Sequence, residues 1–202
     1  VPAPTGVAQR VPKRRGRTSG HGVTVFGVGT EAIFLGGRSG VGKTTVALEM
    51  HAQLTANDVP HGVIDGDFLD MAHPLPWAHK LAEQNLAAIW HNYRALGYQR
   101  LIYINSASVL PDITDELIAA MGDSPTVCAA LLTCSDAIAA QRLTQREQGS
   151  ALDRHLRNSA TTAALLADSV SDCVHVISTD QRPVADIAIQ ILATARWLPP
   201  IR

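Results

Sequence analysis

The sequence is poor in the features that mark disulfide-rich, zinc-binding and membrane proteins. Its 202 residues include only three cysteines, and no two of them have the close spacing of a zinc site or a redox dithiol. No apolar run reaches the roughly eighteen residues that a membrane-spanning helix needs. We therefore expect a cytoplasmic protein with reduced thiols and without a membrane partner.

Acidic residues are absent before Glu31, although the same stretch carries five basic residues. The rest of the chain has 12 basic and 18 acidic residues, so it carries about −6 while the whole chain carries −1. A body with this charge is a poor partner for nucleic acid. We predict that residues 1–30 form a disordered basic tail rich in Pro, Gly and Arg. Residues 31–202 should then form one domain.

From Ala32 onward, short apolar runs alternate with stretches of helical periodicity. The runs predict strands at residues 33–35, 61–64, 101–104, 127–132 and 174–177. Helices are predicted to begin near Lys43 and Ser135 and to span residues 77–96, 112–121, 150–168 and 184–195. This alternation indicates one doubly wound α/β domain with a parallel five-stranded sheet.

The most specific motif is G-x-x-x-x-G-K-[ST], the phosphate-binding loop, which residues 37–44 match at every fixed position. Backbone N–H groups in such a loop point inward and bind phosphate together with the N-terminus of the following helix. We predict that Lys43 contacts the β- and γ-phosphates of ATP and that the Thr44 hydroxyl binds Mg²⁺. Thr45 belongs to the helix, and we expect no direct ligand role for its side chain. The predicted nucleotide-binding segment is Gly37, Arg38, Ser39, Gly40, Val41, Gly42, Lys43, Thr44 and Thr45.

Two aspartates follow the second predicted strand, at the edge where open α/β sheets bind ligands. A kinase needs one carboxylate near the acceptor hydroxyl and another near the metal. We predict that Asp65 holds Mg²⁺ beside Thr44 and that Asp67 acts as the general base. The opposite assignment stays open, as does an acidic turn without a ligand.

The third predicted strand is followed by Asn105 and lacks the acid that motor ATPases use for magnesium and water. The guanine-reading motif N/T-K-x-D is absent as well. Both features favour a kinase over a motor ATPase or a GTPase. Ser106 and Ser108 are candidates for hydrogen bonds to phosphate or acceptor, and ordinary loop serines are the alternative.

Together, the loop at 37–44, the two aspartates and the serine-containing loop resemble the small-molecule kinase branch of P-loop proteins, over about residues 32–197. Adenylylsulfate kinases, gluconate kinases and chloramphenicol phosphotransferases are examples. The resemblance implies strand order 2-3-1-4-5, helices on both faces, a mobile helical lid, ATP and Mg²⁺. Gluconate kinases have His-Pro directly after the aspartates, whereas His73 and Pro74 lie several residues later here. Phe68 and Asp70 stand near positions where adenylylsulfate kinases carry Asn and Arg, so neither substrate is transferred.

Arg142 and Arg146 lie four residues apart on one face of a predicted helix. The resemblance implies that they are lid arginines that neutralise charge on the transferred phosphoryl group. Pairing with nearby acids on a solvated face is the alternative. Arg154 and Arg157 are further lid candidates. Residues 178–183 fill the loop that usually contacts adenine in this fold, and a capped turn into the last helix is the alternative.

These features predict an ATP-dependent small-molecule kinase that moves the γ-phosphoryl group of Mg-ATP to a hydroxyl group. A regulatory ATPase and a non-catalytic ATP-binding module are the alternatives. The acceptor and the oligomeric state stay open.

Overall fold

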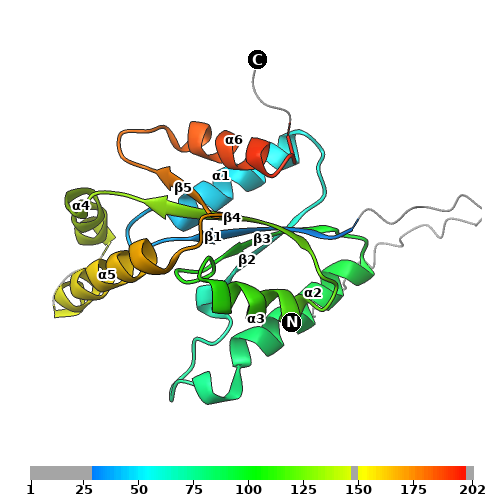
Figure 1. Ribbon diagram of the computed structural model, residues 1–202, viewed down its shortest axis with the longest axis horizontal. Helices are drawn as coiled ribbons and strands as arrows, with labels where there is room; N and C mark the ends of the chain where they lie inside the picture. The colour runs from blue at the N-terminus through cyan, green and yellow to red at the C-terminus, as the bar shows by residue number, and fades with distance from the viewer. Residues whose placement is uncertain (1–28, 147–149, 199–202) are drawn as a thin grey trace, which may run out of the picture.

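The computed structural model describes residues 29–146 and 150–198, which form one layered α/β domain (Figure 1). Its five strands pair in parallel in the order β2-β3-β1-β4-β5. The strands are β1 (Glu31–Gly36), β2 (Gly62–Asp65), β3 (Arg100–Ile104), β4 (Thr126–Thr133) and β5 (His175–Ser178). The predicted fold class and the strand order implied by the resemblance are both confirmed.

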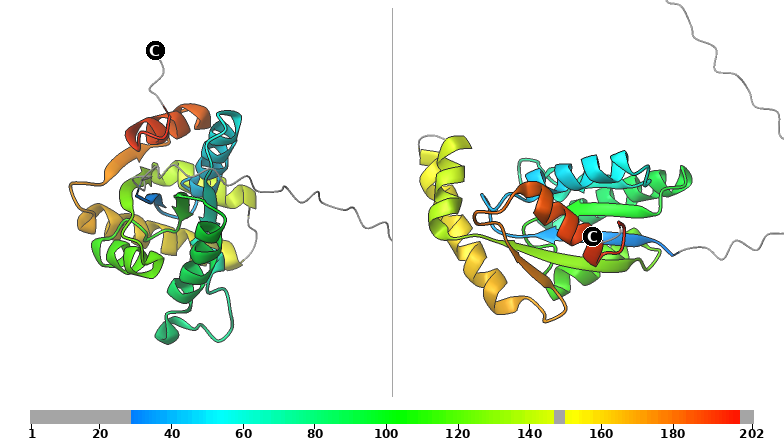
Figure 2. Two further views of the ribbon diagram at one scale, coloured as in Figure 1. Left: turned by 90° about the vertical axis from the view of Figure 1, so that its right-hand side faces the viewer. Right: turned by 90° about the horizontal axis from the view of Figure 1, so that it is seen from above.

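Helices cover both faces of the sheet. On one face α1 (Lys43–Ala56) packs against α6 (Val184–Thr194), and on the other α2 (Leu81–Ala95) packs against α3 (Pro111–Met121). Two further helices, α4 (Asp136–Arg146) and α5 (Ser150–Ser169), lie at the end of the domain towards which the strands run (Figure 2). None of the helices in the described ranges has the length and apolar character to cross a bilayer.

The central strand β1 is buried on both faces because its side chains alternate between two apolar clusters. Ile33 and Leu35 pack in the cluster that contains α1 and α6. Phe34 packs in the other cluster, with Leu86 of α2 and Leu117 of α3. The core therefore fixes β1, and with it the loop that follows its carboxyl end.

The helix predicted at 77–96 is wrong in its first turn. The structure has a separate 3₁₀ turn, η2 (Trp77–His79), and α2 begins only at Leu81. Lys80 between them has a left-handed backbone, with φ 49° and ψ 45°, which an α-helix cannot contain. The segment between β2 and α2 therefore includes the short helical turn η1 (Gly66–Phe68) and η2, and it projects from the body near the bottom of Figure 1.

Candidate functional site

The predicted phosphate-binding loop lies between the carboxyl end of β1 and the first turn of α1. Gly37, Gly40 and Gly42 have positive φ angles of 140°, 85° and 103°. A Cβ on Gly37 would lie 2.6 Å from the Leu132 carbonyl oxygen, and one on Gly40 would lie 2.8 Å from that of Ala139. Both contacts are too short for a side chain, so the path of the loop requires glycine at these positions.

Lys43 is the first residue of α1, and its side chain is buried across the loop. Its ammonium group donates to the Gly37 carbonyl oxygen at 2.8 Å and to Ser106 Oγ at 3.1 Å. Ser106 lies in the turn that follows β3, so the structure brings this candidate to the phosphate-binding loop. Ser108 differs, because its buried hydroxyl donates to the Asn105 carbonyl oxygen within its own turn.

Thr44 and Asp65 lie together beside the loop. The Thr44 hydroxyl donates to Asp65 Oδ2 at 3.4 Å, and Asp65 Oδ1 accepts a hydrogen bond from the Asp67 backbone N–H at 3.1 Å. A hydroxyl and a carboxylate at the end of a phosphate-binding loop are hard oxygen donors of the kind that Mg²⁺ prefers. This donor set therefore fits a magnesium ion.

Asp67, in η1 after β2, lies beside Asn105, the residue that follows β3. Its Oδ1 accepts a hydrogen bond of 2.9 Å from the side-chain amide of Asn105, whose own oxygen accepts from the Ala107 N–H at 2.9 Å. Although Asp67 borders open space, the surrounding protein desolvates its carboxylate and raises its pKa above the ordinary 3.8, while nearby Lys43 opposes the rise. Sequence reasoning missed the role of Asn105, although its place directly after β3 was a usable signal.

Lys43, Thr44, Asp65 and Asp67 all line one cavity of about 630 Å³. Helices α4 and α5 close its other side through Leu143 and His155. The remaining lining residues are Ser39, Gly40, Gly42, Thr45, Phe68 and Met71. Sequence reasoning did not predict four of these lining residues, Phe68, Met71, Leu143 and His155, as part of the site. We call this space the phosphate cavity.

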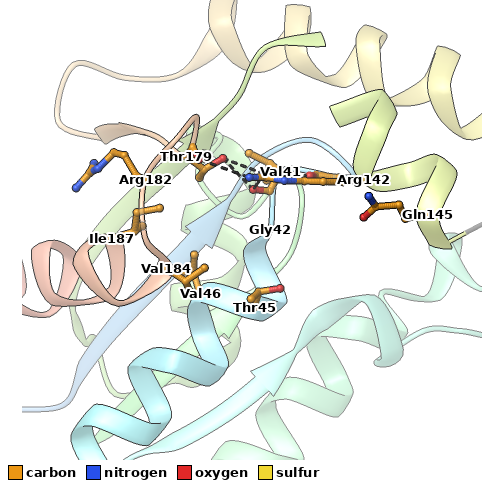
Figure 3. Close-up of a pocket in the computed structure, with 11 residues that line it drawn as sticks. Val41, Gly42, Thr45, Val46, Arg142, Gln145, Thr179, Arg182, Val184 and Ile187 are labelled. Carbon is orange, nitrogen blue, oxygen red and sulfur yellow. Dashed lines mark hydrogen bonds between the residues drawn. The ribbon is translucent and has the colours of Figure 1, made fainter. Parts of the chain in front are cut away.

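A second cavity of about 280 Å³ lies on the other side of the loop (Figure 3). It shares Gly40, Gly42 and Thr45 with the phosphate cavity, so the two meet at the loop. Its other lining residues are Val41, Val46, Arg142, Gln145, Thr179, Arg182, Val184 and Ile187. Thr179 and Arg182 belong to the loop at 178–183 that sequence reasoning singled out for adenine. We call this space the base cavity.

Arg142 lines the base cavity and is not among the described residues that line the phosphate cavity. Its guanidinium group donates to the Val41 carbonyl oxygen at 2.8 Å and to Thr179 Oγ1 at 3.1 Å (Figure 3). The structure thus does not bring Arg142 beside Asp67. The side chains of Arg146 and Arg154 lie outside the described part of the chain, and Arg157 lines neither cavity.

Arg38 also turns away from both cavities. Its buried guanidinium group pairs with Asp136 of α4 and donates to Ser159 Oγ of α5 at 2.8 Å. The Ser159 hydroxyl in turn donates to the Ser39 carbonyl oxygen at 2.7 Å. The side chain of Arg38, a residue of the predicted nucleotide-binding segment, therefore connects the loop to α4 and α5.

No family model matches the sequence, and a comparison with curated proteins gave no match either. Solved structures do match, among them a sugar kinase from Janibacter sp. with a TM-score of 0.56 and 19% identity, over 85% of this chain and 96% of that one. The tunicamycin resistance protein of Deinococcus radiodurans matches with a TM-score of 0.55 and 19% identity, over 82% of this chain and 95% of that one. A gluconokinase from Sinorhizobium meliloti matches with a TM-score of 0.51 and 21% identity, over 83% of this chain and 92% of that one. The fold is thus that of P-loop small-molecule kinases, and identities this low establish the fold alone.

Proposed function

We propose that the protein is an ATP-dependent phosphotransferase that moves the γ-phosphoryl group of Mg-ATP to a hydroxyl group of a small molecule. The observation that carries the proposal is the phosphate cavity, in which Lys43, Thr44, Asp65 and Asp67 meet. Phosphoryl transfer needs a cation for the phosphates, oxygen ligands for the metal and a carboxylate for the acceptor hydroxyl. These four residues supply all three.

ATP would lie across both cavities. The loop N–H groups, the N-terminus of α1 and Lys43 would bind the β- and γ-phosphates. The base cavity offers the apolar side chains of Val46, Val184 and Ile187 and the planar guanidinium of Arg142, on which an aromatic base can stack. Because the two cavities meet at Gly40, Gly42 and Thr45, the triphosphate would follow the loop from one to the other.

Thr44 and Asp65 would hold Mg²⁺. When bound, this ion neutralises charge on the phosphate oxygens during transfer. The hydrogen bond from the Asp67 N–H to Asp65 Oδ1 fixes one carboxylate oxygen and leaves Oδ2 next to the Thr44 hydroxyl.

Asp67 would accept the proton of the acceptor hydroxyl. The amide of Asn105 holds its carboxylate in one orientation. A raised pKa makes this carboxylate a stronger base than an ordinary aspartate, which favours proton transfer from an alcohol. Asp67 also lies on the wall of the phosphate cavity that is formed by the segment after β2, and the acceptor would bind against this wall.

The test measures transfer of labelled phosphate from [γ-³²P]ATP and Mg²⁺ to a panel of hydroxy compounds, with inorganic phosphate release measured in parallel. We expect a labelled organic product and little release of phosphate without an acceptor. Lys43→Ala should reduce transfer by at least about 10²-fold, since an electrostatic contact to the transferred group is lost. Rapid hydrolysis that no acceptor changes would favour the regulatory ATPase instead. Wild-type transfer by a folded Lys43→Ala variant would contradict the site itself.

A further inference from the structure

Large apolar side chains that remain exposed gather on one segment of the described chain. Of eight such side chains in that part of the molecule, four lie within residues 68–77, and between 59% and 70% of their surface is exposed. They are Phe68, Met71, Leu75 and Trp77. This segment follows β2 and projects from the body (Figure 1). Single exposed apolar residues are ordinary, whereas a concentration of them marks a binding surface.

Two of the four, Phe68 and Met71, line the phosphate cavity. Phe68 directly follows Asp67, the proposed general base, and the side chains of both residues line this cavity. The backbone here is anchored, because Leu69 is buried in the core and its carbonyl oxygen accepts a hydrogen bond of 2.6 Å from Asn85. With the backbone held, the exposed Phe68 and Met71 form a defined apolar wall of the cavity.

The charged groups on the same side of the cavity are acidic. Asp67 lines it, and Asp70 follows three residues later on the same segment. Among the described lining residues, only Lys43 and His155 can carry positive charge, and Lys43 contacts the loop and Ser106. Lys80, at the end of the projecting segment, pairs with Glu116 at 2.9 Å. This wall therefore suits neither a carboxylate nor a phosphate on the acceptor.

From the apolar wall and the acidic groups beside it, we propose that the acceptor is a hydroxy compound that is not anionic and that carries an aromatic or aliphatic body. The apolar body packs on Phe68 and Met71 while the hydroxyl reaches Asp67. This inference rests on the proposed phosphotransferase function. It excludes sugar acids and phosphorylated or sulfated compounds as preferred acceptors.

The test compares matched acceptors with the full chain, Mg²⁺ and [γ-³²P]ATP. Each set contains an uncharged polyol, its phenyl or alkyl derivative, the carboxylate analogue and the amine analogue. One such set consists of glucose, phenyl β-glucoside, gluconate and glucosamine. We expect kcat/KM for the phenyl or alkyl derivatives to exceed that of the parent and the carboxylate by at least about tenfold, since buried apolar surface supplies that much. A preference for carboxylates or bare polyols would overturn the inference while leaving the phosphotransferase function intact. Transfer to no compound in any class would contradict both.

Variants locate the effect in the wall. Phe68→Ser and Met71→Ser should each raise KM for the preferred acceptor by about tenfold and leave KM for ATP unchanged. Leu48→Ser, on an exposed apolar residue of α1 that lines neither cavity, is the control and should change neither constant. Asp70→Lys should reduce the discrimination against the carboxylate analogue about tenfold. Unchanged acceptor KM in both serine variants would overturn the apolar wall.

Discussion

Replacing Asp67 by asparagine tests the proposed chemistry most directly. The two side chains have the same shape, and the side-chain oxygen of the variant can still accept the 2.9 Å hydrogen bond from Asn105. Packing and nucleotide binding should therefore survive. What is lost is a carboxylate able to take the acceptor proton.

A positioned general base contributes about 10²–10⁴-fold to rate. We expect Asp67→Asn to lower kcat by that factor, which corresponds to about 2.7–5.5 kcal/mol of transition-state stabilisation. Asn105→Ala keeps the carboxylate but removes the amide that orients it, so its loss of kcat should be smaller. Asp65→Asn instead removes a proposed metal ligand and should raise the Mg²⁺ concentration needed for half-maximal activity.

The assay is steady-state transfer to the identified acceptor, with the concentrations of Mg²⁺ and ATP varied independently. Circular dichroism and ATP binding by calorimetry report whether each variant is folded. Wild-type kcat in Asp67→Asn would refute the assignment of the base. If Asp65→Asn slows transfer at saturating Mg²⁺ while Asp67→Asn weakens Mg-ATP binding, the two aspartates have exchanged roles.

Three further predictions concern residues around the two cavities. Arg142→Ala should raise the Kd for ATP about tenfold in calorimetry, because Val41 and Thr179 lose their common donor and the base cavity loses its planar wall. An unchanged Kd would show that Arg142 does not contact the nucleotide in the base cavity. Arg38→Met should lower the melting temperature by several degrees, because the loss of its buried hydrogen bonds lowers the free energy of unfolding by about 1–3 kcal/mol. Asp136→Asn should have little effect, because the Asp136 side chain is 84% exposed. Burial, together with the nearby His51, lowers the pKa of His61 below 6.5, so its contribution to stability is present above pH 6.5 and is lost as the pH falls. The melting temperature should therefore decrease less between pH 7.5 and pH 5.5 in His61→Gln than in wild type, and equal decreases would contradict this.

The sequence predicted the sheet well because its strands are buried on both faces and read as short apolar runs between helical stretches. It failed at Lys80, where helical periodicity continues through a left-handed residue. Glycine or asparagine usually signals such a break, and the chain has neither at this position. Only residues 77–80, at the end of the projecting segment, were therefore predicted as the start of a helix. Phe68 and Met71 lie outside any predicted strand or helix, so no periodicity indicated that they line the phosphate cavity.

Parallel strands bring their carboxyl ends to one edge, which is why the loop after β1 and the aspartates after β2 could be placed together from sequence. Arginine side chains are harder to place, because they are long and their partners lie far away in the chain. Arg38 meets Ser159 across 121 residues, and Arg142 meets Val41 across 101. No local spacing encodes either pair.

Arg38 and Arg142 restrict how far α4 and α5 could move as a lid. Arg38 and Ser159 connect the loop to α4 and α5, and Arg142 connects α4 to the loop from the other side. Each hydrogen bond contributes roughly 0.5–1.5 kcal/mol, so a swing of both helices that broke all of them would cost on the order of 3 kcal/mol. The mobile lid implied by the resemblance would have to draw that energy from nucleotide binding. The geometry therefore attaches α4 and α5 to the carbonyl oxygens of Ser39 and Val41, and a closing movement of the two helices that left the loop in place would first have to break these hydrogen bonds.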